Sequence, residues 1–154
     1  MDVDQLKGLQ VKFRQGVEKL ELLGKCLQQL ARSQGMDLRV SGVDAEEGEL
    51  GFRFAGTRYY VRTRLTDRSV GDPGMSYNVP MGWLDWGRYN ASGLREPAEQ
   101  SNYYEERGIL CDVDKDEFYC SFTSCEDERL QRGLLQKLAR LVGRTVAQNN
   151  VRAL

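Results

Sequence analysis

The feature that most limits how this chain can fold is a pair of helical apolar patterns, one at each end. In the first segment, apolar residues recur in steps of three and four, which predicts a helix from about residue 4 to residue 33. Asp2 or Asp4 is expected to cap its first turn, and Gly35 to end it. The apolar seam consists of Leu6, Leu9, Phe13, Leu20, Leu23, Leu27 and Leu30, with Gly16 at the one seam position that lacks a large side chain.

That seam has three candidate partners: the domain's own sheet, the last helix, or a second copy of the chain, which would make a homodimer. The last helix is predicted over about residues 125–149, with Ser124 as its cap and acidic residues in its first turn. Its apolar face consists of Leu130, Leu134, Leu138, Leu141, Val142, Thr145 and Val146.

Between the helices, short alternating segments predict antiparallel strands. Residues 38–43, 49–55 and 58–65 form one group, and 108–113 and 117–122 form a hairpin around Asp114–Asp116. Residues 66–102 read as a long connection, within which 81–89 is a further candidate strand. We therefore expect one α+β domain over residues 1–154, with an antiparallel sheet of about five to six strands (within 38–65 and 79–122) packed with the two long helices.

This order of helix, antiparallel sheet and helix resembles the layout of small bacterial secretion chaperones. The resemblance is one of layout, because no sequence motif accompanies it. It implies a noncatalytic protein that binds another protein, and fold alone does not assign such a function.

The absence of histidine removes many catalytic designs at once. Of the 154 residues none is histidine, so Ser-His-Asp and Cys-His pairs and imidazole metal sites are excluded. The run Cys111 to Glu117 alternates aspartates like a calcium loop but lacks the glycine and the final glutamate. We expect no catalytic residue, no metal and no cofactor, with an enzyme built on carboxylates, tyrosine or a thiol (Cys111, Cys120 or Cys125) as the remaining alternative.

Alternation in the third strand places arginines and a tyrosine on one face. This face is a candidate site for an anionic small ligand or single-stranded nucleic acid, through guanidinium contacts and base stacking. In the alternative interpretation, the arginines pair with the chain's own carboxylates. Residues 96–128 carry a net charge of −9 against +4 for residues 52–95. The candidate residues are Arg53, Arg58, Tyr60, Arg62 and Arg64.

A second candidate surface is the aromatic segment Gly82 to Tyr89. Tryptophan, tyrosine and arginine are enriched at protein-binding hot spots, so Trp83, Trp86, Arg88 and Tyr89 are candidate partner-binding residues. The alternative is that the tryptophans fill the core beneath a loop.

Composition limits the setting in which the protein acts. The chain is 40% apolar and 29% charged, as globular proteins are, and it has no apolar run near the roughly 20 residues that cross a bilayer. We expect a cytoplasmic protein with reduced thiols and no membrane partner. The favoured function is a noncatalytic interaction module, of chaperone, adaptor or inhibitor type, that binds another protein through a sheet face and the tryptophan segment.

Overall fold

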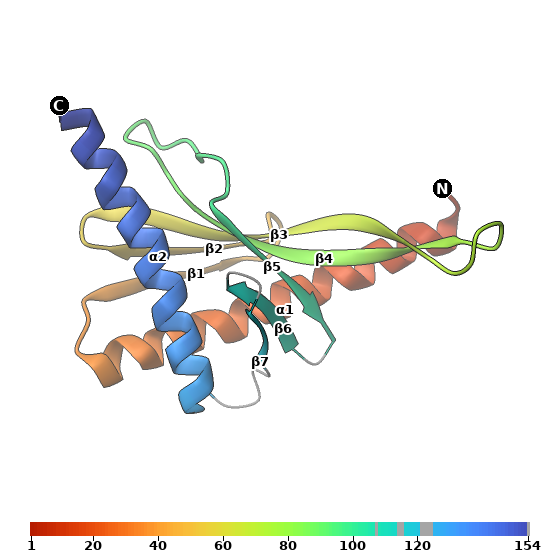
Figure 1. Ribbon diagram of the computed structural model, residues 1–154, viewed down its shortest axis with the longest axis horizontal. Coiled ribbons are helices and arrows are strands. Elements are labelled where there is room, and N and C mark those ends of the chain that lie inside the picture. Colours follow the sequence, from red (N-terminus) through yellow and green to blue (C-terminus); the bar gives the residue numbers. More distant parts are fainter. Residues whose placement is uncertain (107, 114–115, 121–124, 154) are drawn as a thin grey trace.

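The structure, a computed structural model, describes residues 1–106, 108–113, 116–120 and 125–153 (Figure 1). Its first element, α1 (Val3–Gln34), begins and ends within one residue of the predicted bounds. The Asp2 side chain accepts a bond from the Gln5 N–H, and the Gln5 side chain accepts one from the Asp2 N–H, both at 2.8 Å. Gly35 ends the helix with φ of +64°, a left-handed conformation that glycine adopts without strain.

The strands form one antiparallel meander in which each strand pairs with the next along the chain. They are β1 (Leu38–Asp44), β2 (Glu49–Phe54), β3 (Thr57–Val70), β4 (Tyr77–Arg88), β5 (Gln100–Glu105), β6 (Gly108–Val113) and β7 (Asp116–Cys120). The predicted α+β architecture is confirmed. The described part of the chain has seven strands rather than five to six, because the expected long connection contains β4 and the start of β5.

Both helices cover the same face of the sheet. Gly16 of α1 lies against Thr63 of β3, and Tyr59 of the same strand donates to Thr145 of α2 (Glu128–Ala153) at 3.3 Å. Odd-numbered residues of one strand share a face, so α1 and α2 lie side by side on it, α2 crossing the direction of α1 (Figure 1). The core between them includes Leu20, Leu27, Phe52, Val61, Leu84, Trp86, Leu138 and Leu141.

Neither of the two described helices lies on the opposite face of the sheet, which is called the helix-free face below. This face is partly covered by residues 89–98, which follow β4 and fold back over β3. The Tyr60 hydroxyl donates to the Glu96 carbonyl at 2.6 Å, and the Tyr60 side chain is thereby buried.

Helix α2 begins three residues later than predicted. Asp127 accepts bonds from the N–H groups of Arg129 (2.8 Å) and Leu130 (3.4 Å), so Asp127 caps the helix. The predicted cap, Ser124, and the expected hairpin tip at 114–115 lie outside the described residues. At this end of the molecule the Cys26 and Cys125 sulfurs are hydrogen-bonded at 2.6 Å, which joins α1 to the segment that enters α2.

Candidate functional site

The first three turns of α1 leave part of its apolar seam uncovered. Leu20, Leu23, Leu27 and Leu30 are fully buried. Leu6 is 52% exposed, and Leu9 and Phe13 are only partly buried. A groove runs along this part of the helix beside β3, lined by Val3, Leu6, Lys7, Leu9, Gln10, Phe13, Arg14 and Leu65.

One edge of β3 is open beside this groove. The last β3 residue that pairs with β2 is Arg62, opposite Glu49, and the Thr63 N–H still donates to the Gly48 carbonyl at 2.9 Å. From Leu65 to Val70, β3 pairs with β4 alone among the described residues. Backbone groups of alternate residues point to the same side of an antiparallel strand. Leu65, Asp67 and Ser69 therefore present their N–H and C=O groups at this edge.

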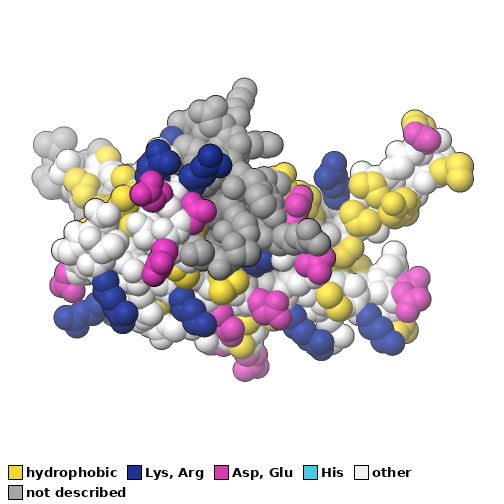
Figure 2. All heavy atoms as spheres, turned by 90° about the horizontal axis from the view of Figure 1, so that it is seen from below, with side chains coloured by type: hydrophobic (Ala, Val, Ile, Leu, Met, Phe, Trp, Pro, Cys, Tyr) yellow, Lys and Arg dark blue, Asp and Glu magenta, His cyan; other side chains and the backbone are white. Residues whose placement is uncertain are grey.

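The end of the β3–β4 hairpin projects from the body together with the start of α1 (Figure 1). Figure 2 shows hydrophobic side chains gathered along this projecting hairpin. Met75 and Tyr77 are 82% and 63% exposed there, and Val3 at the start of α1 is 64% exposed. An isolated two-stranded ribbon is only marginally stable in water, and exposed apolar groups on such a ribbon are a feature of interaction surfaces in general.

Residues Gly82 to Arg88 belong to strand β4, and Tyr89 follows that strand in an isolated bridge with Arg95. Trp86 and Arg88 are buried, with 3% and 4% exposure, and Arg88 pairs with Glu96 at 2.9 Å. Trp83 is half-buried and donates from its indole nitrogen to the Thr66 hydroxyl at 2.8 Å. Two of the four candidate partner-binding residues therefore offer a partner almost no surface.

The five candidate anion-binding residues divide into two groups. Arg62 and Arg64 pair with Glu47 (3.4 Å) and Asp85 (2.6 Å), neither of which belongs to the acidic block 96–128. Tyr60, the expected stacking residue, is 4% exposed. For these three residues the structure matches the alternative interpretation, in which the chain satisfies its own charges.

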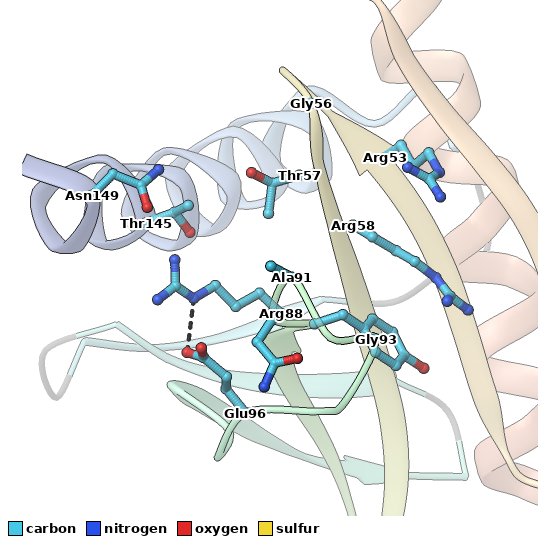
Figure 3. Close-up of a pocket in the computed structure, with 12 residues that line it drawn as sticks. Arg53, Gly56, Thr57, Arg58, Arg88, Ala91, Gly93, Glu96, Thr145 and Asn149 are labelled. Atoms are coloured by element: carbon cyan, nitrogen blue, oxygen red, sulfur yellow. Dashed lines mark hydrogen bonds and ion pairs between the residues drawn. The ribbon is translucent and has the colours of Figure 1, made fainter. Parts of the chain in front are cut away.

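Arg53 and Arg58 are exposed, and no carboxylate of the described residues lies within ion-pair distance of either guanidinium. They line a pocket of about 450 Å³ at the turn between β2 and β3, shared with Thr57, Arg88, Glu96 and Asn149. Figure 3 shows the two arginines extending on the side away from the Arg88–Glu96 ion pair. The Arg58 guanidinium lies 4.1 Å from the centre of the Tyr89 ring.

A carboxylate holds residues 89–98 against β2. Glu49 accepts bonds from the Arg95 guanidinium at 2.6 and 3.1 Å and from the Tyr89 hydroxyl. Burial alone raises the pKa of Glu49, but these hydrogen bonds outweigh it and hold the pKa below its ordinary value. Burial and the nearby Glu49 raise the pKa of the Tyr89 hydroxyl.

Two features that the sequence patterns above do not indicate are the groove and Arg39, which lies opposite Arg53 in the sheet. The sequence did contain a signal for the groove. The apolar seam of the first helix starts at Leu6, whereas its first fully buried leucine is Leu20. The position of Arg39 had no such signal, since it depends on cross-strand register. No group of three or more metal-ligating side chains occurs among the described residues, and neither described helix is long and apolar enough to cross a membrane.

Comparison with known proteins gives no assignment. No family model, no curated protein and no solved structure matches this chain.

Proposed function

We propose that this protein is a noncatalytic interaction module that holds an extended segment of a partner protein along the open edge of β3. The observation that carries the proposal is that an uncovered part of α1 lies beside an unpaired edge of β3. Within the described residues, part of the apolar seam of α1 is uncovered over its first three turns. In the same place β3 has no neighbouring strand on the edge where β2 ends.

A single added strand would cover the uncovered part of the α1 seam and pair with the open edge of β3. Its backbone would pair with Leu65, Asp67 and Ser69, and every second side chain would enter the groove beside Leu6 and Phe13. This mode of recognition takes affinity from main-chain hydrogen bonds and specificity from alternate side chains. The occupant we propose is therefore a partner segment with apolar residues at alternate positions.

The other side of the ribbon is a poorer site for such a segment. There the space between α1 and the hairpin is lined by Asp2, Asp4, Asp67 and Asn78, together with apolar Leu9 and Pro80. Carboxylates beside an apolar peptide would lose hydration without gaining a partner. The apolar groove on the β3 side carries no carboxylate, which favours that edge.

The proposal is tested by photo-crosslinking from Ser69 in extracts of the source cells. A photoreactive residue at position 69 should capture one protein, with the crosslink confined to a short segment of it. A synthetic peptide of that segment should then bind the purified protein and slow amide exchange at Leu65, Asp67 and Ser69. Capture of a second copy of this chain would overturn a heterologous partner and assign the groove to a homodimer.

Leu6 and Val11 provide a matched pair of variants, because each is 52% exposed on α1 and only Leu6 lines the groove. Leu6→Asp should weaken peptide binding by about tenfold or more, as expected for an unpaired carboxylate in an apolar contact. Val11→Asp should leave binding within about twofold, a difference of roughly 0.4 kcal/mol. Equal effects of the two substitutions would remove the groove from the interaction.

A further inference from the structure

A row of arginines crosses the helix-free face of the sheet. Arg39 of β1 lies directly opposite Arg53 of β2, and Arg53 lies directly opposite Arg58 of β3. Residues directly opposite each other in an antiparallel sheet place their side chains on the same face. Tyr89 continues the row, since its N–H donates to the Arg58 carbonyl at 2.9 Å. All three arginines are exposed.

The charges in this row are not compensated within the described residues. Arg39 has a single weak ion pair, at 3.5 Å, with an Asp37 side chain that is itself 88% exposed. Glu96, which lines the same pocket as Arg53 and Arg58, is engaged by Arg88, and Glu49, which contacts Tyr89, is engaged by Arg95. Like charges directly opposite in a sheet destabilise it, so three neighbouring guanidinium groups carry a cost that a bound anion would relieve.

We propose that Arg39, Arg53 and Arg58 form a binding site for a small phosphate-bearing ligand. A guanidinium group matches the geometry of a phosphate with two parallel hydrogen bonds. A phosphate monoester carries a charge of about −1.5 to −2 near pH 7, so one phosphate group balances two adjacent arginines. The row is distinct from the groove at β3, so a failed test of one site does not affect the other.

The pocket beside the row favours a small ligand. Its volume of about 450 Å³ lies within the range of small-molecule sites. Arg53 and Arg58 form one wall, to which Thr57 and Asn149 add neutral polar groups (Figure 3). Asn90 adds another, and such groups suit the uncharged part of a ligand.

Single-stranded nucleic acid fits this surface less well, because binding of that kind relies on aromatic rings free to stack with bases. Tyr60 is 4% exposed beneath residues 89–98. The Tyr89 ring already contacts Arg58, with the guanidinium 4.1 Å from its centre, and Tyr60, whose ring centre is 5.5 Å away. Tyr60 is therefore closed to a base, and the Tyr89 ring is partly occupied by Arg58 of the row itself.

The test is calorimetric titration of the whole protein with inorganic pyrophosphate at fixed ionic strength, paired with thermal unfolding. Pyrophosphate should bind and raise the melting temperature, and sodium chloride at the same ionic strength should not. Arg53→Gln and Arg58→Gln should each weaken binding by about tenfold, as expected for one lost hydrogen-bonded charge contact. Arg39→Gln should also weaken it.

Arg68 is the matched control, an exposed arginine on the same face of β3 but outside the row. Arg68→Gln should leave pyrophosphate binding within about twofold, and circular dichroism should show all four variants folded, as expected for surface substitutions. Equal loss in Arg68→Gln, or no binding by the unmodified protein, would overturn the site. Tighter binding of a single-stranded oligonucleotide than of pyrophosphate at equal salt would overturn the small-ligand assignment.

Discussion

At the scale of single residues, the closest contact between α1 and the sheet depends on the missing side chain of Gly16. A Cβ atom at this position would lie 2.3 Å from the Thr63 hydroxyl oxygen and 2.5 Å from the Tyr104 hydroxyl oxygen. Those hydroxyls hydrogen-bond to each other at 3.1 Å, and Tyr104 also donates to the Lys12 carbonyl of α1 at 2.8 Å. The glycine thus allows a buried polar contact to join the helix to two strands.

Replacing Gly16 by alanine should lower the free energy of unfolding by about 1–2 kcal/mol. Overpacking costs about 1–3 kcal/mol, and the better helix propensity of alanine returns up to about 1 kcal/mol. Urea unfolding measures the difference. Gly143→Ala in α2 is the control: no heavy atom lies within 4 Å of the added Cβ, so this variant should gain about 0.5–1 kcal/mol. Stabilisation by both substitutions would show that the Gly16 contact is looser than described.

Glu49 is a second residue with an effect beyond its own position, because it holds residues 89–98 against β2. Its pKa is lowered on folding by Arg95 and Tyr89, despite burial. A carboxylate with a lowered pKa contributes stability above its unfolded value, and that stability is lost as pH falls through the folded value. The contribution should therefore be present at pH 7 and should disappear on acidification below about pH 4.5.

Glu49→Gln should reduce the free energy of unfolding by about 1–2 kcal/mol at pH 7, because a hydrogen bond to a charged group contributes about 1.5–3 kcal/mol and partial exposure lowers that value. The gap between this variant and the unmodified protein should close as pH falls below about 4.5. Urea midpoints measured from pH 7 to pH 3 give the comparison. Arg95→Gln removes the same bonds from the other side and should show the same closing gap. A gap that persists at pH 3 would mean that packing, and not ionisation, is what Glu49 contributes.

At the scale of elements, the first three strands were predictable because their alternation is regular. Strand β4 was harder to find, since it contains Pro80, Gly82 and Gly87, residues that usually interrupt strands. The structure gives a reason for each glycine. A Cβ at Gly82 would lie 2.1 Å from the Tyr104 ring, and one at Gly87 would lie 2.5 Å from the Tyr60 hydroxyl oxygen, so each glycine makes room for an aromatic ring.

Pro80 is tolerated for a different reason. It lies opposite Asp67, on a part of β4 that has no β5 neighbour. By the alternation of backbone groups, this pair points its N–H and C=O positions outward, so the nitrogen of proline gives up no ladder hydrogen bond. A single sequence does not contain this information, because it depends on where β5 ends.

For the candidate sites too, the sequence predicts what depends on neighbouring residues and not what depends on contacts between distant segments. Alternation within β3 placed Arg58, Arg62 and Arg64 on one face, but the ion pairs of Arg62 and Arg64 come from Glu47 and Asp85 on neighbouring segments. The exposure of Arg53 and Arg58 depends equally on register. The sequence therefore indicated the basic face. It could not indicate which arginines the fold leaves without a neighbouring carboxylate among the described residues.

At the scale of the whole molecule, both helices lie on one face of the sheet and join residues far apart in the chain. Cys26 of α1 is fully buried, and its sulfur lies 2.6 Å from that of Cys125, 99 positions further along the sequence. This contact between thiols thus joins α1 to the segment that enters α2. A covalent bond here would restrain almost the whole sheet between them.

Oxidised glutathione should therefore convert Cys26 and Cys125 to a disulfide. One thiolate attacks the glutathione disulfide and releases one glutathione, and the second thiolate attacks the resulting mixed disulfide and releases another. Peptide mapping should find the Cys26–Cys125 crosslink, and the free energy of unfolding should rise by about 2–5 kcal/mol, because a loop of roughly 100 residues is closed in the unfolded chain. Cys26→Ser should abolish both effects. Crosslinks of Cys26 to Cys111 or Cys120 in place of Cys125 would show that the described sulfur contact is not the one that reacts.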